Sequence, residues 1–132
     1  MNTIRTQEVF TQSVISRYPT LFDADTNSED AIARYGIEIF PGWFPIVERM
    51  IDQINTFAHQ HGYGDSLRIT QIKSKFCMLR CTTTIEDEGL DLLIDQYANQ
   101  ASETCEQCGM PGKIRANRRW KMVLCDTCEM KG

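Results

Sequence analysis

Two Cys-x-x-Cys pairs near the C-terminus are the feature that most constrains what this chain can fold into. They consist of Cys105 with Cys108 and Cys125 with Cys128, and sixteen residues separate the pairs. Each pair forms a tight turn that directs two sulfur atoms inward, so together they supply the four thiolates of a tetrahedral structural Zn²⁺ site. The spacing falls within that of zinc ribbons. The sequence therefore predicts a zinc ribbon over residues 104–132.

The four cysteines also allow two other interpretations. A rubredoxin-like iron site uses the same geometry. A single Cys-x-x-Cys pair can be a redox site, although two matched pairs favour a metal. Because all four ligands are cysteines, no coordination position stays open for a water molecule, which disfavours hydrolytic chemistry at the metal.

The length of the chain, 132 residues, allows one domain with a small appendage. A body of about 100 residues can bury a core, whereas a ribbon of about 30 residues usually needs its metal. We expect a body over residues 1–103 and a ribbon over residues 104–132. The ribbon is expected to dock on the body, because Glu103 and Thr104 lead directly from the last predicted helix into Cys105.

Two features that the sequence lacks, a signal peptide and a membrane span, indicate the cellular compartment that we expect. Residues 1–10 lack the apolar region of a signal peptide. No segment approaches the length of a membrane span. We therefore expect a cytoplasmic protein without membrane contact, in which cysteine pairs bind metal or carry redox chemistry.

Apolar periodicity predicts the secondary structure of the body. Helices are expected over residues 3–18, 28–35, 43–60 and 87–102. An extended segment is expected over residues 36–41. Two β-rich segments, residues 67–73 and 78–84, predict a hairpin that turns near Phe76 and Cys77. The predicted fold class is α+β, with helices packed on a small antiparallel hairpin and a C-terminal zinc ribbon.

Two histidines and two further cysteines could carry chemistry, but each has a simpler structural explanation. His59 and His61 flank the end of a predicted helix, where the helix dipole favours them. Cys77 and Cys81 fit as small buried apolar residues, and neither has a histidine nearby in sequence to activate it. We therefore expect a protein that is not an enzyme. An enzyme that uses Cys77 or Cys81 with a histidine is the third hypothesis.

The charge of the chain is unevenly distributed. A formal net charge of −4 arises from 14 basic and 18 acidic residues. Six of the basic residues and three of the acidic ones lie from residue 104 onward, which leaves eight basic and fifteen acidic residues before it. The body therefore carries −7 and the ribbon +3 before metal binding.

The basic residues gather on a hairpin predicted within the ribbon. Its strands are expected over residues 113–116 and 119–124, with Trp120, Met122 and Leu124 on one face. Such a hairpin fits an acidic protein surface, a phosphate backbone or the acidic body itself. The candidate partner-binding residues are Lys113, Arg115, Arg118, Arg119, Trp120 and Lys121.

Several short motifs follow one another in a recognisable order. They are Gly42-Trp43-Phe44; Gln71-Ile72-Lys73-Ser74-Lys75-Phe76 with Leu79-Arg80; Cys105-Glu106-Gln107-Cys108-Gly109 with Pro111-Gly112; Trp120; and Leu124-Cys125-Asp126. This order resembles a group of uncharacterised small phage and prophage proteins, whose members look like a helical and hairpin body ending in a zinc-ribbon-like unit. Members of that group tend to have Gly-Gly where this chain has Cys77-Met78, and an aromatic residue where it has Cys81.

The resemblance implies a bacterial cytosol and a mobile-element origin. Small accessory proteins of that origin often bind and block host machinery, including defence complexes. We expect a non-enzymatic zinc-ribbon protein that binds a host protein partner and inhibits a defence complex. The alternative is nucleic-acid binding through the basic hairpin, residues 113–121, which predicts an affinity that falls steeply with salt.

Overall fold

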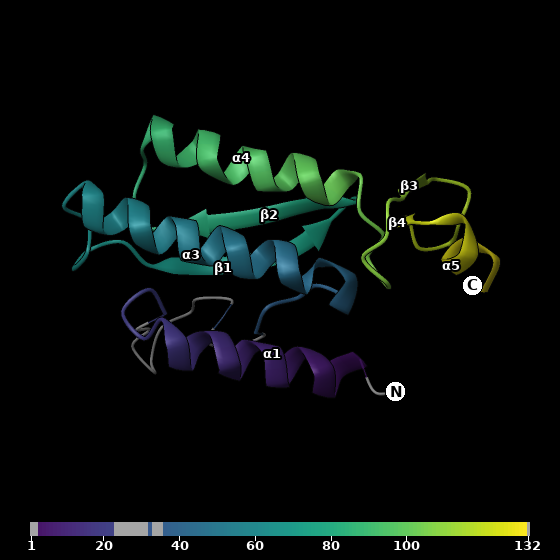
Figure 1. The fold of residues 1–132 in the computed structure, drawn as a ribbon, viewed down its shortest axis with the longest axis horizontal. Coiled ribbons are helices and arrows are strands. Elements are labelled where there is room, and N and C mark those ends of the chain that lie inside the picture. Colours follow the sequence, from purple (N-terminus) through teal and green to yellow (C-terminus); the bar gives the residue numbers. More distant parts are fainter. Residues whose placement is uncertain (1–2, 23–31, 33–35, 132) are drawn as a thin grey trace.

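The body of the protein is a layer of helices packed on a two-stranded hairpin, and a smaller unit follows at one end (Figure 1). A computed structural model describes residues 3–22, 32 and 36–131. The body elements in this part of the chain are the helices α1 (Thr3–Arg17), α3 (Phe44–Gln60) and α4 (Glu88–Ser102), the 3₁₀ turn η1 (Pro41–Trp43), and the strands β1 (Ile69–Lys75) and β2 (Met78–Thr83). The predicted α+β class is confirmed.

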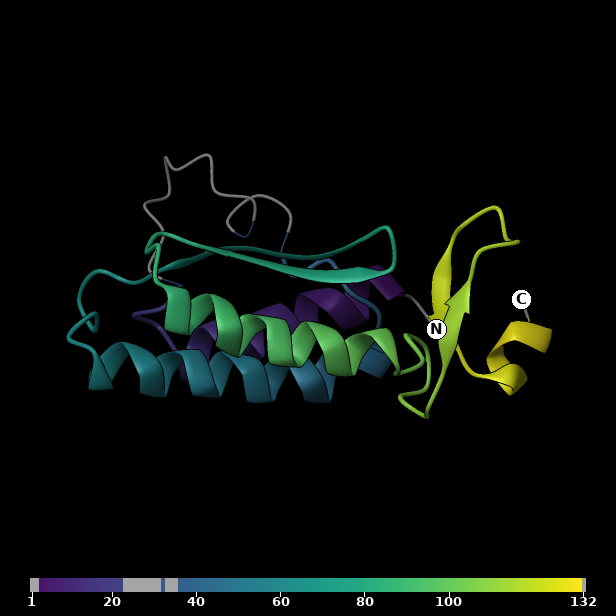
Figure 2. The same cartoon turned by 90° about the horizontal axis from the view of Figure 1, so that it is seen from above.

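Helix α3 provides the largest part of the helical core. Its buried stripe consists of Ile46, Val47, Met50, Ile51, Ile54, Phe57 and Ala58. Pro45 lies in the first turn, where its missing N–H costs no hydrogen bond. In the view turned by 90°, the hairpin lies on one side of the layer formed by α1, α3 and α4 (Figure 2). None of the helices in the described ranges is long and apolar enough to cross a bilayer.

The body hairpin turns through two residues, Phe76 and Cys77, between the paired Lys75 and Met78. Both turn residues have positive φ, 53° and 66°. A type I′ turn requires positive φ at both positions, and residues other than glycine, asparagine or aspartate rarely adopt it. The first strand begins two residues later than the predicted residues 67–73. The turn at Phe76 and Cys77 is confirmed.

The predicted extended segment at residues 36–41 forms one parallel bridge, between Glu38 and Lys73. The Glu38 N–H donates to the Ile72 carbonyl at 2.9 Å, and the Ser74 N–H donates to the Glu38 carbonyl at 3.1 Å. Apart from residue 32, the helix predicted over residues 28–35 lies outside the described residues.

Asp87 caps the N-terminus of helix α4. Thr83 ends strand β2, and Asp87 is the N-cap residue of the helix. The Asp87 carboxylate accepts hydrogen bonds from the Gly89 N–H at 2.8 Å and the Leu90 N–H at 3.2 Å. The strand continues to residue 83, so the chain leaves the sheet before the helix begins.

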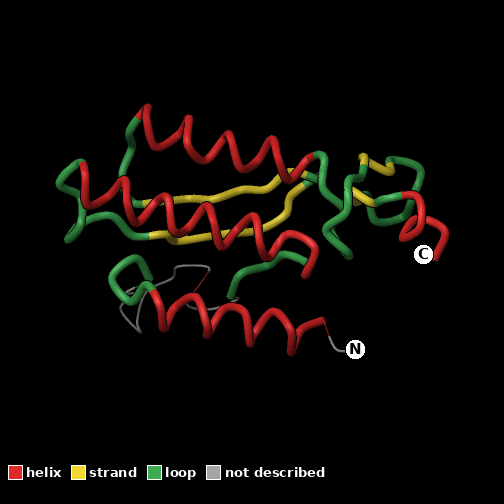
Figure 3. The backbone as a smooth tube through the Cα atoms, in the orientation of Figure 1, coloured by secondary structure: helices red, strands yellow, loops and turns green. Residues whose placement is uncertain are grey.

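The C-terminal unit, which we call the ribbon, contains strands β3 (Lys113–Arg115) and β4 (Met122–Leu124) and helix α5 (Asp126–Lys131), joined by turns (Figure 3). The strands pair antiparallel. They are shorter than the predicted 113–116 and 119–124, because residues 116–121 form a loop. Strand β4 is buried on both faces.

The two sides of β4 pack against different hydrophobic cores. Val123 belongs to the core of the body, whereas Met122 and Leu124 pack with the buried cysteines of the ribbon. Trp120 was expected to share the face of Met122 and Leu124. It lies instead in the loop before the strand, with 75% of its surface exposed.

Candidate metal centre and adjoining cavity

The four predicted ligands come together in the ribbon. The Sγ atoms of Cys105, Cys108, Cys125 and Cys128 all lie within 4.8 Å of one another. Those of Cys108 and Cys125 are 3.5 Å apart. Four sulfurs at the usual Zn–S distance of about 2.3 Å would be separated by roughly 3.8 Å in a tetrahedron. The cluster can therefore hold a metal ion with little movement of the side chains.

The first cysteine pair has the backbone geometry of a metal-binding turn. The Gly109 N–H donates to the Cys105 carbonyl at 3.0 Å, and Gly109 has a φ of +83°. Burial acts to raise the pKa of Cys105, but the surrounding backbone N–H groups, led by that of Cys125, lower this pKa to about 6. At Cys105 these groups favour the thiolate, which is the form that binds a metal, whereas a hydrogen bond with the Cys125 thiol raises the pKa of Cys128 to about 12.

The second pair is positioned by the start of a helix. The Cys128 N–H points at the Cys125 Sγ at 3.4 Å, and the Glu129 N–H donates to the Cys125 carbonyl at 2.9 Å. Residues 126–131 form α5 directly after Cys125. Because the chain continues as a right-handed helix, Glu129 can stand where the first pair has a glycine.

The ribbon is joined to the body at Gly42, with no space for a side chain between them. The Gly42 N–H donates to the Glu106 carbonyl at 2.7 Å. A Cβ atom on Gly42 would lie 2.1 Å from the Cys105 carbonyl oxygen and 2.5 Å from the Glu106 carbonyl carbon. The next residue, Trp43, is fully buried and donates from its indole N–H to the Thr104 carbonyl at 2.9 Å.

Glu106 is a buried acidic residue at this junction, with 1% of its surface exposed. Its carboxylate accepts a hydrogen bond from the Val123 N–H at 2.7 Å, and its own N–H donates to the Val123 carbonyl at 2.8 Å. Burial raises the pKa of this carboxyl, while hydrogen bonds from the Val123 N–H and the Ser74 side chain lower it. Glu106 thus connects β4 to the body hairpin. Sequence reasoning missed this role, because an acidic residue inside a Cys-x-x-Cys pair ordinarily faces solvent.

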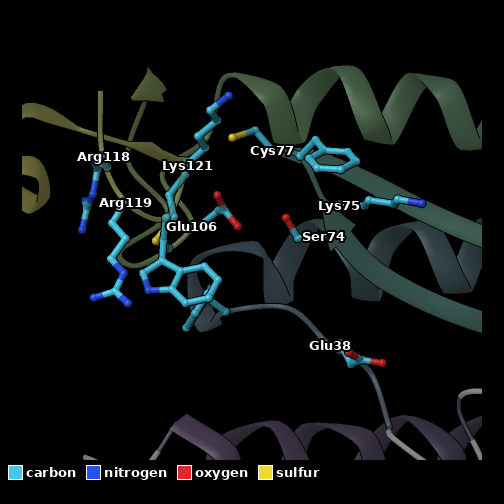
Figure 4. A pocket seen from close by; sticks show the side chains of 12 residues that line it. Glu38, Ser74, Lys75, Cys77, Glu106, Arg118, Arg119 and Lys121 are labelled. Carbon is cyan, nitrogen blue, oxygen red and sulfur yellow. The ribbon is translucent and has the colours of Figure 1, made fainter. Parts of the chain in front are cut away.

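A cavity of about 750 Å³ lies between the body hairpin and the ribbon. The body side includes Ser74, Lys75 and Phe76, and the ribbon side includes Arg119, Trp120 and Lys121. Figure 4 shows Glu106 between the labelled basic residues of the ribbon and the residues of the hairpin.

The predicted partner-binding residues separate into two groups. The first group holds the ribbon together: Arg115 pairs with Asp126 at 2.7 Å, and Arg118 pairs with Glu129 at 3.3 Å. Both acidic partners lie in the ribbon, so these arginines do not attach it to the acidic body.

The second group is exposed. Arg119, Trp120 and Lys121 are exposed and line the cavity. Lys113 is exposed on β3 and lines a separate, shallow depression. The residues of the basic hairpin that remain available at the cavity are therefore Arg119, Trp120 and Lys121.

The remaining candidates for chemistry lie on different elements, with the histidines at the end of α3 and the cysteines on the body hairpin. The His59 and His61 side chains are exposed at the end of α3, and the His61 ring stacks on Phe57 with centroids 4.0 Å apart. Burial raises the pKa of the Cys77 thiol. Burial also raises the pKa of Cys81, to about 12. Thiols with raised pKa values are poor nucleophiles at neutral pH.

We expect Cys81 to resist alkylation by iodoacetamide in the folded, metal-loaded protein at pH 7. A pKa near 12 leaves roughly a thousandth of the thiolate that an ordinary cysteine has at that pH. The rate should rise with pH and should become ordinary after denaturation. Peptide mass spectrometry locates the label. Rapid labelling of Cys81 before unfolding would revive the hypothesis of a catalytic thiol.

Comparison of the chain with protein-family models, with curated proteins and with solved structures gives no match.

Proposed function

We propose that this chain is a non-enzymatic binding protein whose four cysteines hold Zn²⁺ and thereby fix the ribbon against the body. The ribbon then presents Arg119, Trp120 and Lys121 to a protein partner. The observation that carries the proposal is the 75% exposure of Trp120, beside a cavity and between two cations. Exposed tryptophan and arginine are the residues that most often dominate the energy of protein interfaces.

The opposite wall of the cavity supports the same function. Phe76 has 78% of its surface exposed at the tip of the body hairpin. Two large aromatic side chains exposed around one cavity are unusual for a surface that contacts only water. A metal-held ribbon keeps the backbone of Trp120 in place beside this hairpin, so less conformational entropy is lost on binding.

Nucleic-acid binding is supported less well. Aromatic and basic residues together are typical of single-strand binding sites. However, Arg115 and Arg118 are paired with acidic residues, and Glu38 and Glu106 line the same cavity. The chain as a whole carries −4. A protein partner therefore fits the charges better than a polyanion.

The resemblance to phage and prophage proteins supports a partner in the cytosol of a bacterial host. Small proteins of that kind often inhibit host complexes, and a defence complex is the target that we propose. This part of the proposal rests on the resemblance, while the contact surface rests on the geometry of Trp120.

Affinity capture tests the contact surface. The tagged wild-type protein should retain a specific protein from a bacterial host lysate in near-equal amount. Trp120→Ala should lose most of it, since truncation of an interface tryptophan commonly costs about 2 kcal/mol or more, or roughly thirtyfold in affinity. Leu92→Ala is the matched control, because Leu92 is 66% exposed on α4 and is not among the residues lining the cavity. Equal capture by all three proteins would refute the assigned surface.

A further inference from the structure

The turn of the body hairpin combines unfavourable backbone geometry with an exposed aromatic side chain. Phe76 and Cys77 both adopt positive φ, which suits asparagine and glycine far better. The Cys77 side chain is buried, but that of Phe76 is 78% exposed, so burial does not offset the cost of placing phenylalanine there. Within the free protein, the Phe76 ring meets the Lys75 ammonium, 5.8 Å from the ring centroid, but burial does not explain a phenylalanine at this position.

The cavity beside this turn has a defined charge at its rim. Three exposed cations line it, namely Lys75, Arg119 and Lys121, while Glu38 is the exposed anion among its lining residues. Arg118 is neutralised by Glu129, and the Glu106 carboxylate is buried and hydrogen-bonded. The accessible rim is thus positive, on a protein whose net charge is −4.

The walls between these charges are apolar. Phe40, Phe76, Trp120 and Met122 line the cavity. Its volume, about 750 Å³, lies in the range of sites that enclose a ligand. An occupant that matches both features carries negative charge at its edges and a large apolar group at its centre.

We propose that this cavity binds an acidic peptide segment of the partner protein, one large apolar side chain of which contacts Phe76 and Trp120. The acidic groups of the segment pair with Lys75, Arg119 and Lys121. This inference rests on the proposed function and specifies the chemistry of the partner. A single-stranded nucleic acid fits less well, because a polyanion needs a continuous basic track and is repelled by the net charge of the protein.

Synthetic peptides of three designs test this inference directly. One has tryptophan between acidic residues, one has alanine between acidic residues, and one has tryptophan between basic residues. Each is labelled with fluorescein, and its binding to the metal-loaded protein is measured by fluorescence anisotropy beside an oligothymidylate. We expect the first peptide to bind at least about tenfold more tightly than each of the other three probes.

Two substitutions and a matched control locate the binding. Arg119→Glu should lower the affinity for the first peptide by about tenfold or more. Lys113→Glu makes the same charge change outside the cavity and should alter this affinity by less than about twofold. Phe76→Asn should also lower the affinity for the first peptide by about tenfold, because the aromatic contact is lost. The same substitution should raise the thermal midpoint of the protein, because asparagine tolerates positive φ. If Phe76 had a purely structural role, its substitution would not lower the peptide affinity while raising the thermal midpoint.

The inference is overturned if no peptide binds, if the basic peptide binds as well as the acidic one, or if the oligothymidylate binds most tightly. Its failure is distinct from that of the proposed function. Lysate capture that depends on Trp120, without a preference for acidic peptides, refutes only the peptide chemistry. Capture that does not depend on Trp120 refutes the proposed surface itself.

Discussion

Gly42→Ala is expected to lower the free energy of unfolding by about 3 kcal/mol, in the upper part of the range for overpacked sites. The added Cβ would lie 2.1 Å from the Cys105 carbonyl oxygen. Because the neighbouring atoms belong to the backbone, no side-chain rotation can make room. The ribbon would have to move away from the body, and the hydrogen bond from the Gly42 N–H to the Glu106 carbonyl would be lost.

Thermal denaturation measures this effect, and we expect the midpoint to fall by roughly 10 °C. Gly62→Ala is the matched control, since a Cβ there meets no atom within 4 Å and the cost comes only from its φ of +75°. That control should lose about 1 kcal/mol. Hydrogen exchange should show faster exchange at the amide of residue 42 in Gly42→Ala, because its acceptor is the Glu106 carbonyl of the ribbon. If the thermal midpoint of Gly42→Ala equalled that of Gly62→Ala, the close contact between Gly42 and the ribbon backbone would be contradicted.

Metal content separates undocking from unfolding of the ribbon. All four cysteine ligands come from residues 105–128, and Gly42 contributes none of them. Gly42→Ala should therefore still bind metal, although its ribbon no longer packs on the body. Loss of metal along with stability would mean that the ribbon holds its ion only when docked.

The elements of the body were largely predictable, because apolar periodicity is a local signal. Helix α3 was expected over residues 43–60 and is observed over Phe44–Gln60. The hairpin turn was predicted, but the positive φ values of Phe76 and Cys77 were not, since neither residue favours them. The sequence contained no sign that phenylalanine would occupy a position suited to asparagine.

The junction between the ribbon and the body was not predictable, because it depends on contacts between residues far apart in the sequence. Gly42 and Glu106 are 64 positions apart and form one backbone hydrogen bond. Likewise, the alternation in residues 119–124 placed Trp120 with Met122 and Leu124. The observed strand begins only at Met122, since residues 116–121 form a loop, and the body covers the other face of the strand through Val123. Trp120 lies outside the strand and is left exposed.

Removal of the metal is expected to have the largest effect of all on the ribbon. The buried residues of the ribbon's separate core are Cys105, Met122, Leu124 and Cys128, so two of these four belong to the cysteine cluster that can hold the ion. Such a core is too small to fold alone. A structural Zn²⁺ site contributes on the order of 10 kcal/mol of binding free energy, which is folding free energy for a unit of this size. Without the ion, we expect residues 104–132 to lose their fixed structure.

Hydrogen exchange measured by mass spectrometry, before and after chelation, tests this expectation. The amides of β3, β4 and α5 should lose protection, whereas those of α3 should keep most of theirs because its core is formed by the body. Cys128→Ser should reproduce the loss, and Cys81→Ser, outside the cluster, should keep about one metal ion per chain. Elemental analysis of the purified protein distinguishes zinc from iron. Unchanged protection of the ribbon after complete removal of the metal would show that packing on the body, and not the ion, holds the ribbon in place.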